Sequence, residues 1–248
     1  MPMFTQLLVL IVFGSLIIWT ICDRVARTQL KTKSWQDWLL DSTGLSIQGM
    51  LIPLLQITLI YQLYNYLLPA QQGCLQLSPI FTFILSFVVV DYGYYWNHRL
   101  LHRGWFWQVH QTHHTVTQMD VFGTSRNTLW ASFLIIYLWI HALFLYLLAD
   151  STGYLLGISL TSALDLWRHS RLIISPHSWL YSYLSPWLIL PQDHARHHAC
   201  SVHYYNYGAN FKLWDRWHGT FYPGKDLPAE IGITTPLTLT KKLFFPFK

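Results

Sequence analysis

Long apolar runs dominate this chain and restrict it to folds that place much of their surface in a membrane. A helix needs about 20 apolar residues to cross the ~30 Å hydrocarbon core of a bilayer. Runs near that length, with a shorter last one, cover residues 3–22, 47–68, 77–96, 129–148 and 154–168. Only 11% of the 248 residues are charged, whereas soluble domains carry about 25%. We therefore expect an all-α integral membrane protein with four to five transmembrane helices.

The basic residues predict the orientation of these spans. The sixteen Lys and Arg lie between the apolar runs or at their ends, and four of them fall within residues 23–44. The positive-inside bias makes that segment cytoplasmic and the N-terminus external. Five crossings then place every histidine cluster on the cytoplasmic side, in a bacterial inner membrane or the endoplasmic reticulum. The basic residues form no dense stripe, so we expect no nucleic-acid partner.

The order of these features predicts one membrane domain, 1–248, with five parts. Residues 1–96 hold the first three spans, 97–128 a first histidine block and 129–168 a helical hairpin. Residues 169–222 hold a second histidine block within a cytoplasmic helical cap, and 223–248 form a tail.

Histidines are concentrated in two short segments. Residues 98–114 contain five of the thirteen and residues 194–198 contain three, at spacings of three and four that share a helix face. Imidazole suits Zn, Cu, Fe and Ni, and eight exceed the ligands of one catalytic zinc. Two metals in one pocket are therefore expected. Interfacial histidines that merely fill helix surfaces would explain one pair. They would not explain three spaced clusters, which are His98 and His102, then His110, His113 and His114, then His194, His197 and His198.

Three further residues extend this metal site. His169 ends the last apolar run, and Asp165 lies four residues before it on the same helix face. A carboxylate beside a metal-bound imidazole fixes its tautomer. We expect Asp165 and Asp91 in that role, with a helix cap or an ion pair as the alternative for each. The histidines that we do not expect to bind metal are His141, His177, His203 and His218.

The two blocks together resemble the fatty acid hydroxylase and sterol desaturase superfamily, especially the branch of alkylglycerol monooxygenase and sterol C5 desaturase. The resemblance covers roughly residues 80–222. Its motifs here are H-R-x-x-H and W-x-x-H-x-x-H-H within Asp91–His114, Trp167-Arg168-His169-Ser170, His194-Ala-Arg-His-His198, Asn206-Tyr207-Gly208, Leu213-Trp214-Asp215-Arg216 and Gly219-Thr220-Phe221. One local departure is Trp217-His218, where a Leu-Phe pair is common.

This resemblance implies a membrane-bound di-iron monooxygenase that uses O2 to hydroxylate, or desaturate, an unactivated C–H position of a lipid. Zinc is possible in the purified protein. The implied ligands are His98, His102, His110, His113, His114, His169, His194, His197 and His198. The reaction needs two electrons, and the sequence holds no G-x-G-x-x-G and no cysteine cluster for an iron–sulfur centre. A separate reductase, ferredoxin or cytochrome is therefore the expected donor.

The basic residues that follow the second histidine block predict where this donor docks. Arg196, Lys212 and Arg216 would attract an acidic protein, although contact with lipid phosphates is an equal alternative. The lipid pocket is expected to open toward the bilayer at the level of Tyr94, Tyr95 and Trp96.

Two other functions remain open from the residues alone. A zinc-dependent membrane hydrolase or isomerase would need a general base beside its ligands, as in H-E-x-x-H, and the single Glu, Glu230, is far from every cluster. A non-catalytic membrane metal or haem carrier would need fewer ligands.

Overall fold

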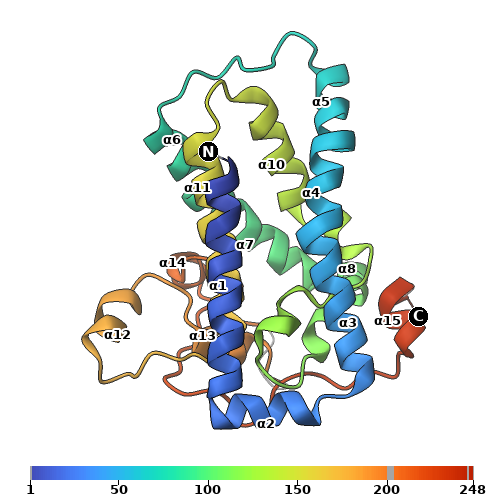
Figure 1. Ribbon diagram of the computed structural model, residues 1–248, viewed down its shortest axis with the longest axis vertical. Helices are drawn as coiled ribbons and strands as arrows, with labels where there is room; N and C mark the ends of the chain where they lie inside the picture. Colours follow the sequence, from blue (N-terminus) through green and yellow to red (C-terminus); the bar gives the residue numbers. More distant parts are fainter. Residues whose placement is uncertain (1, 200–203, 245, 248) are drawn as a thin grey trace.

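The chain is all-helical in the part that the computed structural model describes, residues 2–199, 204–244 and 246–247. Long apolar helices stand together at one end of the molecule, and short helices and loops form a cap at the other (Figure 1). Three isolated β-bridges are the remaining regular pairings among these residues. The expected all-α class is confirmed.

The first apolar run is helix α1 (Pro2–Cys22), which ends at a sharp corner. Asp23 caps the next helix, α2 (Arg24–Thr32), by accepting a hydrogen bond from the backbone N–H of Ala26 at 2.7 Å. The chain bends by 92° at this corner, so α2 lies across the end of the cap (Figure 1).

The second run belongs to one continuous helix of 33 residues, Trp35–Leu67, which starts twelve residues before the expected span. Pro53 does not interrupt it, because π-helical turns on both sides accommodate the missing N–H donor. Its parts are α3 (Trp35–Ser46), η1 (Ile47–Leu51), α4 (Ile52–Leu55), η2 (Gln56–Ile60) and α5 (Tyr61–Leu67).

The third run is also longer than expected and carries the first histidine of the site. It continues from Pro79 to Leu101 through α6 (Pro79–Ile84), η3 (Leu85–Val89) and α7 (Val90–Leu101). Tyr95 is completely buried, whereas Trp96 is 45% exposed.

The fourth run is a broken helix, which corrects the expected continuous span. The chain is extended at Ile135, between α9 (Ala131–Leu134) and α10 (Ile136–Leu147). The amide of Asn97 donates to the carbonyl of Leu134 at 2.9 Å, and its oxygen accepts from the N–H of Ile136 at 3.1 Å. The break is tolerated because these backbone groups are satisfied.

Length and composition qualify two helices of the described chain as membrane spans, or three if the bent α1–α2 pair counts as one. The qualifying helices are Trp35–Leu67 and Pro79–Leu101. Helix α10 has 12 residues and α11 (Thr152–Arg168) has 17. The expected total of four to five spans therefore remains a prediction.

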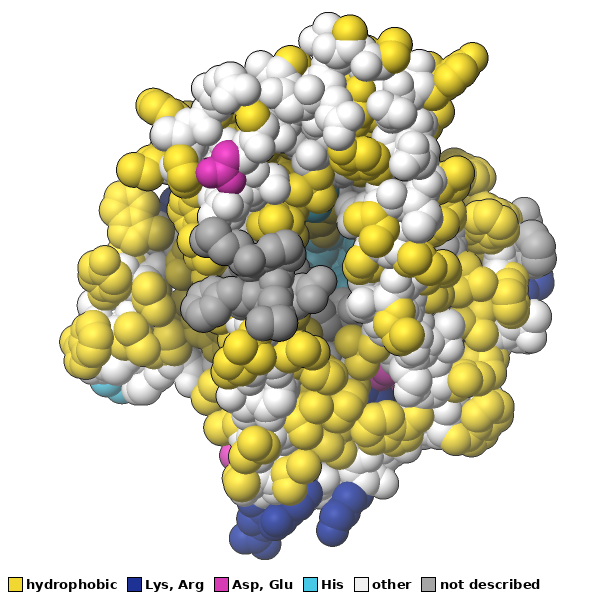
Figure 2. Space-filling view, turned by 45° about the horizontal axis from the view of Figure 1, so that its top comes forward, with side chains coloured by type: hydrophobic (Ala, Val, Ile, Leu, Met, Phe, Trp, Pro, Cys, Tyr) yellow, Lys and Arg dark blue, Asp and Glu magenta, His cyan; other side chains and the backbone are white. Residues whose placement is uncertain are grey.

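The long helices pack in two sets, one around α11 and one around α10, and the helix Pro79–Leu101 belongs to both. Helix α11 lies along α1, α6 and η3, whereas α10 lies along α5, η2 and α7. Glycines allow the closest approach, since a Cβ at Gly153 would lie 1.9 Å from the carbonyl oxygen of Pro79. Seen from the apolar end, the molecule is hollowed between the helices, and histidine side chains lie inside the hollow (Figure 2).

The cap consists of short helices joined by loops. Helix α12 (Trp179–Leu184) projects sideways (Figure 1), with Trp179 78% exposed. The other elements are α8 (Gly104–His110), η4 (His113–Thr115), η5 (Val121–Ser125), α13 (Pro191–His197), α14 (Leu213–Trp217) and α15 (Leu239–Phe244).

Candidate metal centre

Nine buried histidines gather into two groups, and they are the nine named from the sequence. In each group one ring nitrogen per residue lies within 4.8 Å of all the others. The five-histidine group contains His98, His102, His110, His114 and His197. The four-histidine group contains His113, His169, His194 and His198. The structure thus brings together residues from α7, α8, η4, α11 and α13 and the turns that end them.

Each H-x-x-H-H motif contributes to both groups. His194 and His198, four apart around α13, face the four-histidine group, whereas His197 faces the other. In the first motif, α8 ends at His110 and the chain continues through a turn into the 3-10 helix η4. The expected single helix face is therefore wrong for that motif, although His113 and His114 still diverge into different groups.

The inner nitrogens have the spacing of metal ligands. The Nε2 atom of His98 lies 3.2 Å from that of His110 and 3.1 Å from that of His197. In the other group, the Nε2 atom of His194 lies 2.9 Å from that of His169 and 3.2 Å from that of His198. Two nitrogens bound at right angles to one metal, each about 2.1 Å from it, would lie about 3.0 Å apart.

Backbone carbonyls fix the tautomer of several of these rings. The Nδ1–H groups of His98 and His197 donate to the carbonyls of Tyr207 and Tyr205 at 2.8 and 2.7 Å. His113 donates in the same way to Arg126 at 3.1 Å. Each such bond places the ring proton on Nδ1 and makes Nε2 the unprotonated nitrogen, the arrangement found in established metal sites.

The unsatisfied ring nitrogens of His114 support metal binding in these groups. Both of its ring nitrogens are buried, and the described residues give neither a hydrogen-bond partner. A buried, unsatisfied polar group costs about 1–3 kcal/mol, and coordination to a metal would remove that cost. The all-imidazole donor set fits iron or zinc and is unsuited to Mg²⁺ or Ca²⁺.

Burial disfavours the charged form of several of the nine histidines. Each of the nine is at most 6% exposed. Desolvation, with neighbouring imidazoles adding repulsion, lowers the pKa of His113 to about 3. The same causes lower the pKa of His110, His114, His194 and His198 well below the ordinary value of 6.5. Neutral imidazole is the form that binds a metal.

The two aspartates expected around the site differ in their contacts. Asp165 contacts His169, since its carboxylate lies 3.2 Å from Nδ1 of His169 and its backbone carbonyl accepts from the same nitrogen at 2.8 Å. The carboxylate also forms the ion pair that was the alternative, with Arg168 at 2.8 Å. Asp91 contacts no histidine in the described chain. It accepts instead from the indole N–H of Trp214 at 2.6 Å and from the N–H of Asn210 at 2.9 Å.

A third carboxylate, Asp215, supports the site and was missed as a functional residue. It accepts from the backbone N–H groups of Tyr207 and Gly208 at 2.8 and 2.7 Å, and from the hydroxyl of Thr220. These bonds hold the loop whose Tyr207 carbonyl orients His98. The N-Y-G and L-W-D-R motifs marked these residues, but the sequence did not reveal that they contact each other.

The three residues expected to dock an electron donor do not form one surface. Lys212 is buried, and its ammonium group pairs with Asp193 at 2.7 Å. Arg216 is exposed and donates to the carbonyl of Pro186. Arg196 is half-buried beside Tyr222. A protein partner could touch the two arginines but not Lys212.

The other histidines lie outside both groups, as expected, where the structure describes them. Nδ1 of His141 lies 3.0 Å from the hydroxyl of Tyr154. His177 is exposed, and His218 stacks on Tyr95. His203 lies outside the described residues.

Comparison with known proteins identifies related sequences. Alkylglycerol monooxygenase of Xenopus tropicalis is 28% identical over 176 residues, 69% of this chain and 36% of that protein. The human alkylglycerol monooxygenase is 30% identical over 167 residues, 64% and 34% of the two chains. Ornithine lipid hydroxylase OlsE of Rhizobium tropici is 29% identical over 169 residues, 62% and 46%. The chain thus spans about a third to a half of the length of these relatives.

No solved structure shows a significant match. The sequence model for fatty acid hydroxylases matches residues 83–220, more than half of the chain and a range that includes all nine grouped histidines. The chain belongs to the fatty acid hydroxylase family.

Proposed function

We propose that this protein is an O2-dependent di-iron enzyme that hydroxylates an unactivated C–H bond of a membrane lipid at the cytoplasmic face. The observation that carries the proposal is the pair of adjoining all-histidine groups in the cap below apolar helices. Two iron ions held there would supply oxidising power that side chains lack. One oxygen atom would enter the C–H bond, and the other would leave as water with two electrons and two protons.

The histidines would bind the two iron ions, and the surrounding backbone would orient the imidazole rings. The five-histidine group would hold one iron and the four-histidine group the other. The carbonyls of Tyr207 and Arg126 would fix two of the rings through their Nδ1–H groups. Histidine-only ligation avoids burying several carboxylate charges next to a membrane, where such charges are costly.

The hollow between the two helix sets provides an entry path for a lipid tail (Figure 2). Tyr94 lies next to the site, with its ring centre 5.4 Å from that of His98 and 4.6 Å from that of Tyr137. Of the three residues expected at the opening, Tyr95 is fully buried, so the opening would lie on the Tyr94 side of α7. The relatives act on alkylglycerols and ornithine lipids by their names, which makes lipids of these classes the first candidates.

The distribution of charge supports a cytoplasmic site. Arg24, Arg27 and Lys31 are exposed on α2, at the cap end of the molecule. Residues 68–78, which join the long helices at the opposite end, contain no charged side chain. This asymmetry follows the positive-inside bias. The same orientation would give a cytoplasmic reductase, ferredoxin or cytochrome access to the cap.

A zinc hydrolase or isomerase fits the cap less well. Its general base would have to lie beside the metal ligands, yet Glu230 is exposed and outside both groups. Nine grouped imidazoles also exceed the need of a single-metal carrier.

Metal and product analysis of the intact protein tests this proposal. Protein purified without chelators should contain two irons per chain, with Mössbauer spectra of a coupled pair. Incubation with 18O2, a reducing system and either a 1-O-alkylglycerol or an ornithine lipid should give one labelled oxygen per product. His198→Ala is the inactive control, and His177→Ala, an exposed histidine outside both groups, is the active one. Two tightly bound zinc ions and product without the label would contradict the proposal.

A further inference from the structure

A buried network of charges connects the corner between α2 and α3 to the loop that follows the first histidine motif. Lys33 pairs with Asp41 and also with Asp120, the latter at 2.8 Å. Arg126 pairs through Nε with Asp41 at 2.5 Å and through NH1 with Asp37 at 2.6 Å. The side chains of Lys33, Asp41, Asp120 and Arg126 are each at most 4% exposed, so solvent screens these pairs little.

This network determines the shape of the loop. Arg126 also donates through NH1 to the carbonyl of Thr115 at 3.2 Å and so joins the two ends of the segment 115–126. Asp120, between them, accepts from the N–H groups of Phe122 and Gly123. On the other side, Gly44 of α3 touches the loop, since a Cβ there would lie 2.1 Å from the carbonyl oxygen of Ser125.

The loop in turn holds one histidine of the four-histidine group. The carbonyl of Arg126 accepts the Nδ1–H of His113 at 3.1 Å. That bond fixes the tautomer of His113, whose ring centre lies 5.3 and 4.6 Å from those of His169 and His198. The five-histidine group receives no comparable bond from this loop among the described contacts.

We propose that Asp41 and Arg126 form a clamp that positions His113 for metal binding in the four-histidine group. The inference rests on the proposed two-metal function. Asp41 and its neighbours Lys33 and Asp37 lie outside the segment 83–220 that the family match covers. Arg126 and Asp41 touch no inner nitrogen, so they are positioning residues that act through the Arg126 carbonyl.

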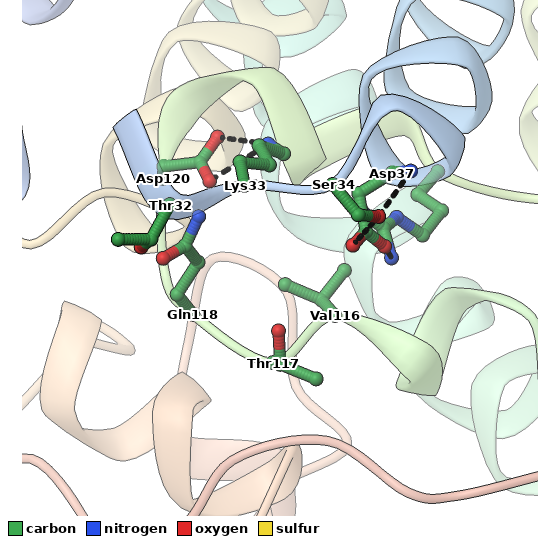
Figure 3. Close-up of a pocket in the computed structure, with 9 residues that line it drawn as sticks. Thr32, Lys33, Ser34, Asp37, Val116, Thr117, Gln118 and Asp120 are labelled. Atoms are coloured by element: carbon green, nitrogen blue, oxygen red, sulfur yellow. Dashed lines mark hydrogen bonds and ion pairs between the residues drawn. The ribbon is translucent and has the colours of Figure 1, made fainter. Parts of the chain in front are cut away.

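A polar cavity beside the clamp offers water a route to it. The cavity has a volume of about 180 Å³ and is lined by Lys33, Asp37, Asp120 and Arg126 together with the polar side chains of Thr32 and Gln118. Figure 3 shows the carboxylate of Asp120 turned toward Lys33 at its edge. Water in this cavity would compete with Asp41 for hydrogen bonds to the Arg126 guanidinium if the ion pair were weakened. The buried pair with Asp41 therefore keeps the guanidinium in place.

The test is a titration of metal-free, folded protein with Fe²⁺ under anaerobic conditions, with the number of ions bound and the melting temperature measured together. Asp41→Asn should reduce tight binding from two ions to one, with affinity at the lost site at least tenfold weaker. Replacing a metal-site supporting residue typically costs about 10–100-fold in affinity. Asp23→Asn, the same change at the cap of α2, should keep both ions.

A double variant separates positioning from stability. Asp41→Asn combined with Arg126→Met also removes the buried guanidinium, which the single change leaves with the partly exposed Asp37 as its carboxylate partner among the described residues, so its melting temperature should recover toward that of the wild type. Under the clamp hypothesis the second ion stays lost. If both ions remain in Asp41→Asn, or the second ion returns with stability in the double variant, the clamp is overturned.

Two further outcomes bear on the clamp and on the proposed function. Should the double variant not fold, Arg126→Met alone removes both the pair with Asp41 and the bond to Thr115, and retention of both ions there would equally overturn the clamp. A wild-type protein that binds fewer than two ions would count against the proposed function itself.

Discussion

His114 and His198 belong to different histidine groups, yet their rings lie 4.6 Å apart and nearly parallel, at 24°. His198 is also 4.6 Å from His113, its partner within the four-histidine group. The two groups are therefore in direct contact through their imidazole rings. Ions held in the groups would be neighbours in one pocket, as an enzyme that uses two metals on one O2 requires.

The division of the second motif between the groups leads to a first prediction. His198→Ala leaves three ligands in its group and all five in the other, so bound metal should fall from two ions to one per chain. Turnover should drop by at least about 100-fold, because the loss of a ligand exceeds the cost of losing a supporting residue. Metal analysis alongside an activity assay checks this. Two retained ions would contradict the assignment of His198.

Acidification should destabilise the metal-free protein. The pKa of His113 is about 3 in the folded chain, against an ordinary 6.5, so only the unfolded chain gains this proton between those values. Stability is therefore unaffected above about pH 7 and falls as the pH drops below 6.5, by up to about 1.4 kcal/mol per pH unit for one such group. His114 and His194 act in the same direction.

Thermal unfolding in detergent at pH 7.5, 6 and 5 measures this effect. The melting temperature of the metal-free protein should fall with each step, and the metal-loaded protein should fall more steeply once protons displace the metal. An unchanged melting temperature from pH 7.5 to 5 would mean that these imidazoles are solvated rather than buried.

Asp215 offers a test of the supporting loop. Asp215→Asn keeps the size of the side chain but replaces one acceptor oxygen with an NH2 group. The amide can then accept from the N–H of Tyr207 or of Gly208 but not from both. The Tyr207 carbonyl should then hold His98 less firmly, and metal affinity or activity should decrease about 10–100-fold. Thr220→Val removes the hydroxyl's bonds to Asp215 and Tyr95 but leaves the bonds of Asp215 to the loop backbone, so it should have a smaller effect. Equal effects would argue against a role through the backbone of the loop.

The sequence predicted the site more fully than it predicted the fold around it. Histidine spacing and the family motifs named all nine histidines that the structure groups, because a metal site of this kind admits few residue types. That they bind metal stays a prediction. The division of these histidines between two groups could not be predicted from the sequence, because it depends on how α8, η4 and α13 direct neighbouring side chains. Spacing alone suggested one helix face where the chain in fact turns after His110.

The helices were predicted where apolar periodicity was continuous and mispredicted where distant side chains decide. A proline within an apolar run, such as Pro53, is typical of an interrupted helix, yet π-helical turns on both sides keep this helix continuous. The break at Ile135 depends on Asn97, 37–39 residues away in the chain. Likewise, Lys33 and Arg126 were counted only as loop charges, because their buried partner Asp41 could be recognised only in three dimensions.

Asn97 should be important for stability. Asn97→Ala leaves the carbonyl of Leu134 and the N–H of Ile136 without these bonds at the break between α9 and α10. Two such groups should cost about 2 kcal/mol or more. Gln48→Ala, which removes a single side-chain bond to Ser132, should cost about 1 kcal/mol or less. Unfolding of both variants in the same detergent gives the comparison, and an equal loss would mean that the break has other support.

Charge reversal at Arg216 and Lys212 should have different consequences. Arg216 is exposed, so Arg216→Glu should fold and bind metal normally. If an acidic donor docks there, turnover with that donor should fall several-fold and lose salt dependence, while turnover with dithionite stays unchanged. Lys212→Glu would instead place a second carboxylate against Asp193 in the interior, next to His194 on α13. That variant should lose metal and activity with both reductants. Loss with both reductants in Arg216→Glu as well would remove the support for docking at this surface.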